Sequence, residues 1–318
     1  CYSGIENEPE FTIPSGWYDE DINVSIQTSN PNATIKFTQN GDEPDNNNEE
    51  YSSPISLYET SIVSAKAFST NNNLPSSTSD AIYLINEQQS GMNVFSVMTD
   101  SLNLWDWETG IYVLGENASS DYPYYGSNFW QPWSKKSRLK YFNSDGILKS
   151  EEMIDLEIHG GWSRAEPQKS FRLDFKNEYS GLFEHPIMMN KPEITSFNNL
   201  NLRNGGQHVW SDKLQDAIIS NVTRGTHISY SSWEPAILYL NGDFWGIYGV
   251  REKIDEHYVE NNFAVPSESV DLINSFGVLN GEGLSFNSDA EQILDLDPES
   301  FGFINAFGSV FDLDSYID

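Results

Sequence analysis

The sequence contains one cysteine, which is its first residue. One thiol forms no disulfide within the chain and cannot supply the several thiolates of a structural zinc site. The sequence also lacks any run of about 18 consecutive apolar residues. These absences exclude a disulfide-stapled scaffold, a zinc–thiolate site and a membrane-spanning helix.

Basic residues are scarce, with 17 Lys and Arg against 48 Asp and Glu and a net charge of −31. Such an acidic chain repels the phosphates of nucleic acids, so we expect no DNA or RNA partner. Nine of the 17 basic residues fall between residues 135 and 176, together with seven acids. This locally positive stretch suits an anionic ligand, and a mixed-charge β-surface is the alternative.

No signal peptide precedes the cysteine. A chain that begins at its only cysteine resembles a mature bacterial lipoprotein, whose first residue carries the lipid. We therefore expect a lipid anchor on Cys1 as the only membrane contact, residues 1–8 as a tether, and an extracytoplasmic location at the cell surface. An arbitrary start of the sequence is the alternative.

Residues 9–86 predict an all-β domain. Residues 22–28, 33–38, 61–69 and 81–85 alternate apolar and polar side chains, and Asn-, Pro- and Gly-containing turns separate them. Strands at this spacing are typical of an immunoglobulin-like β-sandwich. The segments 11–18, 35–44, 51–55 and 64–68 resemble the small β-sandwich module found at the C-termini of chitobiases and β-hexosaminidases. We assign no chemistry to it, with sugar stacking on its exposed aromatics as the alternative.

Residues 87–92 are a polar linker, and residues 93–318 mix strands with helices. The sequence predicts a strand at 94–98, a hairpin over 238–250, and helices over 209–221, 252–261 and 300–311. It thus indicates an α+β second domain.

The segment from Ile158 to Phe175 carries the clearest chemical signal. Residues 153–158 and 170–175 alternate like paired strands, and the loop between them contains two glycines, Arg164 and Lys169. Glycines let backbone N–H groups approach an anion closely, and nearby cations neutralise its charge. Kinases cover nucleotide phosphates in this way. The usual kinase glycine spacing is absent, however, so an ordinary hairpin with exposed cations is the alternative.

The second domain resembles the CotH family, atypical kinases first known from bacterial spore coats. The most specific match is the hairpin with Gly160-Gly161-Trp162-Ser163-Arg164 and Pro167-Gln168-Lys169-Ser170-Phe171-Arg172. Further matching segments, in order, are residues 94–100, 104–106, 110–113, 129–130, 202–206, 240–248 and 252–255. The resemblance implies a fold similar to protein kinases, with an N-lobe and the start of a C-lobe.

The resemblance also implies roles for individual residues. Lys169 would contact the ATP phosphates, Arg164 a terminal phosphate, and Gly160 and Gly161 the covering loop. The remaining implied nucleotide-site residues are Asp212, on the helix that orients the lysine, and Glu252, at the hinge. The alternatives are a surface lysine at Lys169, bonds to local carbonyls for Arg164, and a helix cap for Asp212.

Phosphoryl transfer also needs acids that hold magnesium. In the CotH family they lie downstream of the part matched here, so we expect no catalytic residue in this chain and place the catalytic acids beyond Asp318. The expected protein is a fragment of a longer, surface-anchored protein kinase, itself inactive, with ATP and magnesium bound by the full-length protein. Its expected partner is a protein substrate or a surface glycan. A non-enzymatic extracellular module that binds carbohydrate or protein on a kinase-like scaffold is the alternative function.

Overall fold

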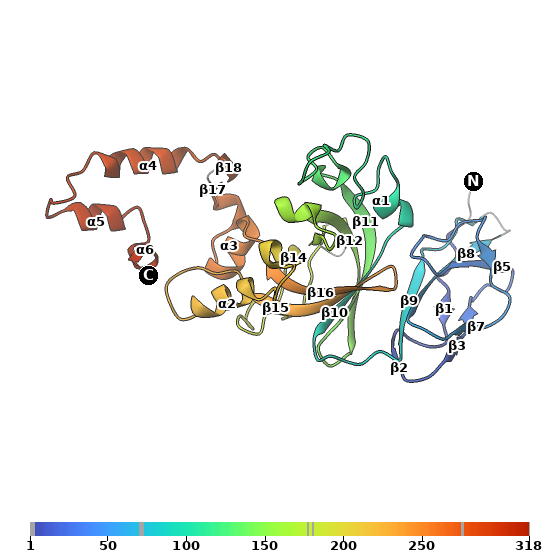
Figure 1. The fold of residues 1–318 in the computed structure, drawn as a ribbon. Helices are drawn as coiled ribbons and strands as arrows, with labels where there is room; N and C mark the ends of the chain where they lie inside the picture. The colour runs from blue at the N-terminus through green and yellow to red at the C-terminus, as the bar shows by residue number, and fades with distance from the viewer. Residues whose placement is uncertain (1–3, 70–72, 177, 180, 275–276, 318) are drawn as a thin grey trace.

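The computed structural model describes residues 4–69, 73–176, 178–179, 181–274 and 277–317. Figure 1 shows a β-rich N-terminal domain, a second domain built on a β-barrel, and a helical segment that extends away from the barrel. The expected two-domain architecture is therefore confirmed. Within the described ranges, every helix is too short or too polar to cross a membrane.

Two residues that bear on the sequence predictions lie outside the described residues. They are Cys1, which was expected to carry a lipid, and Asp318, beyond which the catalytic acids were expected. The lipid anchor and the downstream position of the acids therefore stay predictions, since the structure tests neither.

Two β layers enclose the core of the N-terminal domain. Its strands are β1 Glu10–Phe11, β2 Gly16–Tyr18, β3 Ile22–Val24, β4 Ile26–Gln27, β5 Ala33–Thr38, β6 Glu49–Glu50, β7 Ile55–Leu57, β8 Ser61–Ser69 and β9 Ser79–Ile85. A five-stranded sheet has the order β2-β9-β8-β5-β6, and the pairs β3-β7 and β1-β4 face it across buried apolar side chains. The predicted strands β5 and β8 have the expected bounds, whereas the predicted strand 22–28 is divided at Ser25, because β3 and β4 pair with different partners.

The segment expected as a tether is partly docked on this domain. Ile5 forms a parallel bridge with Leu74, and the carboxylate of Glu6 accepts hydrogen bonds from the side-chain amides of Asn30 and Asn73. Glu6 is only 6% exposed. From Gly4 onward the structure therefore differs from a free tether, because these polar contacts hold the segment on the sandwich.

Seven strands of the second domain close into a barrel with the order β10-β11-β12-β13-β14-β16-β15. They are β10 Asn93–Met98, β11 Ser134–Phe142, β12 Leu148–His159, β13 Ser170–Asp174, β14 Asn199–Arg203, β15 Trp233–Leu240 and β16 Asp243–Glu252. All neighbours are antiparallel except β10 and β15, which pair in parallel. The predicted strand at 94–98 and the predicted hairpin over 238–250 are confirmed, but the sequence did not predict barrel closure.

The barrel interior is the larger apolar core. Buried and partly buried side chains alternate along β13. Phe171 and Leu173 are fully buried, whereas Arg172 and Asp174 are only partly buried. This alternation is the period of a strand with one face on the core. It fixes the register of β13 against β12 and therefore the position of the loop that joins them.

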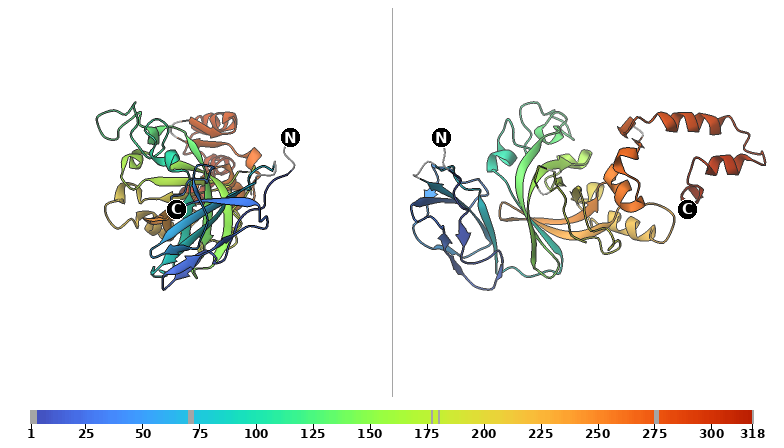
Figure 2. Two further views of the ribbon diagram at one scale, coloured as in Figure 1. Left: turned by 90° about the vertical axis from the view of Figure 1, so that its right-hand side faces the viewer. Right: turned by 180° about the vertical axis from the view of Figure 1, so that it is seen from behind.

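Helices lie at the ends of the barrel and in the C-terminal segment. They are α1 Ser101–Trp105, α2 Gln215–Val222, α3 Glu256–Phe263, α4 Leu284–Leu294, α5 Phe303–Gly308 and α6 Leu313–Ile317, with short 3₁₀ turns η1 Asn128–Trp130, η2 Trp162–Ala165, η3 Gly206–His208 and η4 Ser267–Ser269. A small hairpin, β17 Leu272–Asn274 and β18 Gly277–Asn280, precedes α4. Figures 1 and 2 show α4, α5 and α6 extending away from the barrel.

The predicted helix bounds were wrong in three places. Helix α2 begins at Gln215 rather than at residue 209, because Lys213 has a left-handed φ of 60° that interrupts the helical path. Helix α3 begins after Asp255, whose extended backbone and side chain cap it, so Glu252 lies on β16. Helix α5 is confined to Phe303–Gly308, between Gly302 and Ser309 as its caps.

The two domains share an apolar interface. Ile62, Ile82 and Leu84 of the N-terminal sheet pack in one buried cluster with Met98 and Phe142 of the barrel. The ring of Trp17 meets Phe142 edge-on at a centroid distance of 5.1 Å. Residues 87–92, expected as a flexible linker, therefore join two domains that are in direct contact.

Candidate functional site

The β12–β13 hairpin carries the predicted site. Its strands pair from Asp155 with Asp174 to His159 with Ser170, and the loop then turns through η2. Gly160 has a φ of 111°, and a Cβ there would lie 2.7 Å from the hydroxyl of Ser163. Only glycine suits that position without strain. At Gly161, by contrast, a Cβ would meet no atom within 4 Å, so its backbone is accessible.

Lys169 is enclosed at the base of this loop. It is 4% exposed, and its Nζ donates to the carbonyl oxygens of Arg164 at 2.7 Å and Glu166 at 3.0 Å. The same nitrogen lies 3.9 Å from the ring centre of Phe129 and 5.0 Å from that of Tyr112. Burial lowers the pKa of Lys169 to about 8, partly offset by the nearby Glu166 carboxylate. The alternative of a surface lysine is therefore wrong, and Lys169 is a buried internal donor.

Arg164 is also turned inward. Its Nε donates to the carbonyl oxygen of Gly160 at 2.6 Å, and its guanidinium donates to that of Phe129 at 3.0 Å. The guanidinium also lies over the ring of Trp130 at 5.7 Å, and burial lowers its pKa. The hairpin thus brings Arg164 and Lys169 onto one turn, and both side chains donate hydrogen bonds to main-chain carbonyls. The alternative of local carbonyl bonds describes the contacts of Arg164.

A ring of polar contacts anchors the hairpin to the barrel. The hydroxyl of Tyr112 donates to the carbonyl oxygen of Pro167 at 2.7 Å and accepts from the backbone N–H of Lys169 at 3.0 Å. The fully buried Asn204 donates to the carbonyl oxygen of Gln168 at 2.6 Å and accepts from the hydroxyl of Ser170. The sequence reasoning assigned no role to these residues, although they lie in segments that carried the resemblance.

Asp212 and Asp216 have different surroundings. Asp212 precedes α2, and its carboxylate accepts the backbone N–H of Leu214 at 2.9 Å, which is a local turn contact. Asp216, one turn later, lies 2.6 Å from Arg203 and 3.1 Å from Arg251. Within the described part of the chain, neither acid forms an ion pair with Lys169. The nucleotide role of Asp212 stays a prediction. Of the two acids, Asp216 is the one that forms ion pairs with arginines.

Glu252 belongs to a buried polar network. Its carboxylate lies 2.7 Å from Nζ of Lys191, and it accepts from the backbone N–H of Ser232 and the amide of Asn262. Both charged side chains are less than 10% exposed, at 4% and 8%. These contacts satisfy the carboxylate inside the fold, and its predicted contact with a nucleotide is not tested by them.

The basic side chains between residues 135 and 176 are largely engaged within the protein. The ion pairs are Arg138–Asp80, Lys140–Glu151, Arg172–Glu157, Arg172–Asp174 and Lys176–Asp155. Together with the inward contacts of Arg164 and Lys169, they leave little of the expected positive field. The mixed-charge β-surface describes this region. Among the described residues, no group of three or more His, Cys, Asp or Glu is arranged to hold a metal ion.

Two sequence families match the chain. The family described as CotH kinase protein matches residues 156–300, and the one described as Chitobiase/beta-hexosaminidase C-terminal domain matches residues 13–79. The recognition of a CotH segment behind a chitobiase-type β domain is confirmed. No curated protein compared with the chain matches it. The CotH segment contains the hairpin and all the predicted nucleotide-site residues, whereas the enclosing rings of Tyr112 and Phe129 lie before it.

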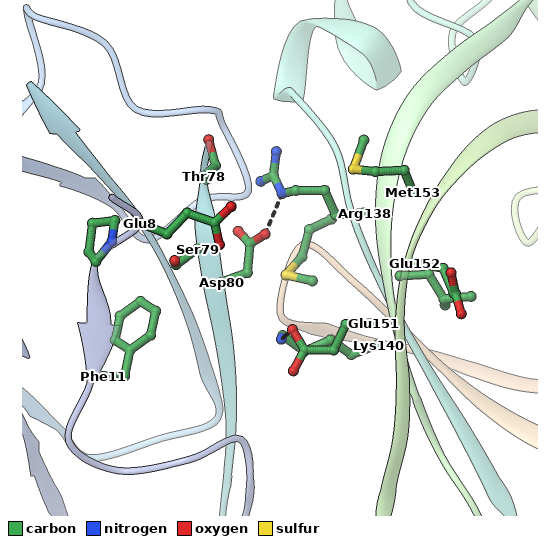
Figure 3. Close-up of a pocket in the computed structure, with 13 residues that line it drawn as sticks. Glu8, Phe11, Thr78, Ser79, Asp80, Arg138, Lys140, Glu151, Glu152 and Met153 are labelled. Carbon is green, nitrogen blue, oxygen red and sulfur yellow. Dashed lines mark hydrogen bonds and ion pairs between the residues drawn. The ribbon is translucent and has the colours of Figure 1, made fainter. Parts of the chain in front are cut away.

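A cavity of about 310 Å³ lies between the barrel and the β domain (Figure 3). Its charged lining includes Arg138 and Lys140 from the barrel and Asp80 from β9, and Figure 3 marks the Asp80–Arg138 ion pair across it. A neighbouring cavity of about 530 Å³ shares Arg138 and Met153. Both cations in the first cavity are already paired with carboxylates, so this lining serves domain contact and presents no evident ligand chemistry.

Proposed function

We propose that this chain contains part of a CotH-type kinase, which transfers a phosphoryl group from ATP to a serine or threonine of a protein substrate. The observation that supports it is the hairpin at residues 159–170. A glycine with positive φ, Arg164 and Lys169 lie on a single turn inside the segment that matches the CotH kinase family. Glycine-bearing loops with a strand lysine serve phosphate binding in kinases.

The present conformation does not offer Lys169 to a phosphate. Lys169 Nζ is bound to the carbonyls of Arg164 and Glu166 and is covered by the ring of Phe129. Nucleotide binding therefore requires η2 to move away from Lys169. In this proposal the magnesium-binding and catalytic acids belong to sequence beyond Asp318, and the protein is held at the cell surface through Cys1.

Calorimetric titration with ATP and magnesium tests the nucleotide proposal. The wild-type chain should bind weakly, because it lacks the magnesium acids; Lys169→Ala should lose roughly tenfold or more of that affinity, and Lys149→Ala should bind as wild type. Lys149 is a suitable control because it is an exposed lysine near the start of β12, before the part of that strand that pairs with β13. Melting curves of each variant separate loss of binding from loss of fold. Equal affinities in the wild type and Lys169→Ala would remove Lys169 from the nucleotide site.

The enclosed state of Lys169 favours a second candidate function. A buried lysine that satisfies two carbonyls is a structural element, which suits a scaffold without phosphoryl transfer. In this alternative the chain is an extracellular binding module for carbohydrate or protein. The absence of measurable ATP binding, with a folded protein and a bound macromolecular or saccharide ligand, would favour it over the kinase.

A further inference from the structure

Two exposed aromatic side chains contact Glu166 at the end of the β12–β13 hairpin, and a third packs against one of them. Tyr122 is 49% exposed, Trp162 is 60% exposed and Trp210 is 75% exposed. They come from three separate segments: the loop before η1, η2 itself, and the turn after η3. We call these four residues the aromatic tip. Exposed aromatic groups gathered from distant segments often mark a binding site rather than an accident of the surface.

Hydrogen bonds to one carboxylate organise the aromatic tip. The hydroxyl of Tyr122 donates to Oε1 of Glu166 at 3.0 Å, and the indole N–H of Trp210 donates to Oε2 at 2.8 Å. The rings of Tyr122 and Trp162 meet at 78° with centroids 6.0 Å apart. The polar edges of Tyr122 and Trp210 are thus fixed to Glu166, while much of each ring remains exposed. Side chains already held in place lose less conformational entropy when a ligand binds.

The chemistry of this arrangement suits a sugar ring. A pyranose has an apolar C–H face, which can cover an exposed aromatic face, and a rim of hydroxyl groups. An ionised carboxylate accepts strong charge-assisted hydrogen bonds from hydroxyls, and each oxygen of Glu166 can accept more than one. Within the described residues, Glu166 forms no ion pair that would neutralise it. Apolar rings with a few fixed polar groups are typical of small-ligand sites.

Other ligand classes fit less well. The net charge of −31 disfavours an acidic saccharide or a nucleic acid. An organic cation beside Glu166 would meet the N–H edge of Trp210 and the hydroxyl of Tyr122, whereas cations prefer aromatic faces. A stable protein partner needs an interface much larger than these four side chains.

We propose that the aromatic tip binds a neutral saccharide, with a sugar ring stacked on Trp162 or Trp210 and its hydroxyls bonded to Glu166. This proposal gives a ligand class to the second candidate function and rests on that candidate. It does not require ATP binding or the release of Lys169.

An array of short neutral oligosaccharides, probed with the full 318-residue chain, tests the proposal. The strongest hit is then titrated by calorimetry and by tryptophan fluorescence. We expect at least one of Trp162→Ala and Trp210→Ala, the variant that lacks the stacking ring, to weaken binding roughly tenfold, and Glu166→Gln to weaken it severalfold. Tyr58→Ala is the matched control, because Tyr58 is an aromatic side chain of the β domain with 68% exposure. It should bind as wild type.

Several outcomes would overturn the proposal. They are an array without hits, unchanged affinity in both tryptophan variants, loss of binding in Tyr58→Ala alone, and displacement of the sugar by tetramethylammonium. Lys169→Ala separates the two functions. If this variant still binds the saccharide, and neither it nor the wild-type chain binds ATP, the kinase proposal alone is defeated. ATP binding without saccharide binding defeats the aromatic tip alone.

Discussion

The ammonium nitrogen of Lys169 lies 3.9 Å from the centre of the Phe129 ring, although 40 positions separate the two residues in the chain. The side chain reaches this ring from the position just before β13 and donates to the carbonyls of Arg164 and Glu166 in and after the η2 turn. Lys169 therefore fastens η2 to the loop that precedes β11. A neutral lysine amine still has two N–H donors, so it can serve both carbonyls after it loses a proton.

The buried Lys169 should make stability depend on pH in the alkaline range. Its pKa is about 8 in the folded chain, against an ordinary value of 10.5. Between these values the unfolded chain binds more protons, so stability should rise from about pH 8 to about pH 10.5, by up to about 1.4 kcal/mol per pH unit from this group. Lys169→Met should remove this rise while retaining apolar packing. Urea unfolding of both proteins across this range measures the difference.

The pH dependence of the free energy of unfolding must be compared between the wild type and Lys169→Met, since tyrosines also titrate above pH 9. Lys169→Met should lose about 1–3 kcal/mol near pH 8, because two carbonyl oxygens lose their donor. Parallel stability curves for the two proteins would show that Lys169 is not held as the structure places it.

His159 should make the fold sensitive to acid. Burial, together with Arg203, Arg172 and Arg164, lowers the pKa of this imidazole from 6.5 to about 4. The unfolded chain therefore binds more protons between pH 4 and pH 6.5, and the contribution of His159 to stability is lost as the pH falls through this window. The His159 resonance can be assigned by its loss in His159→Gln. Its NMR titration should have a midpoint near pH 4. A midpoint near 6.5 contradicts the structure.

Local sequence signals predicted the strands and turns but not what encloses the site. Asn241 and Gly242 both have left-handed φ values, 51° and 90°, as expected for the turn between two alternating strands. Closure of the barrel depends instead on the parallel pairing of β10 with β15, which are far apart in sequence and carry no local sign of it. Similarly, the loop of Arg164 and Lys169 indicated clustered cations, but the rings that cover Lys169 come from segments before β11.

Glu252 should prove essential for stability. Replacing it with alanine leaves Lys191 buried without its carboxylate partner, so we expect a loss of about 3–5 kcal/mol in the free energy of unfolding. Glu50→Ala is a matched control, since Glu50 pairs with Lys36 at the surface and its side chain is 63% exposed. It should change stability by less than about 1 kcal/mol. Both values come from urea unfolding. If Glu252→Ala instead keeps wild-type stability but weakens ATP binding, the nucleotide role implied by the resemblance is favoured.

The ion pair between Arg138 and Asp80 should couple the unfolding of the two domains. Arg138 Nε lies 2.6 Å from a carboxylate oxygen of Asp80, and the guanidinium also donates to the carbonyl oxygen of Gly41 at 2.9 Å. Both side chains are mostly buried, and burial raises the pKa of Asp80. Arg138→Met removes the cation paired with this acid, at a cost of about 3–5 kcal/mol to the folded, docked state.

The penalty in Arg138→Met should fall chiefly on the interface, because Asp80 regains water when the domains separate. We therefore expect the wild-type chain to melt in one calorimetric transition and the variant to melt in two. Asp80→Asn in the same background should restore part of the coupling, since a neutral amide is less costly to bury than an unpaired carboxylate. A single transition at the wild-type midpoint in Arg138→Met would mean that the apolar cluster around Phe142 alone holds the domains together.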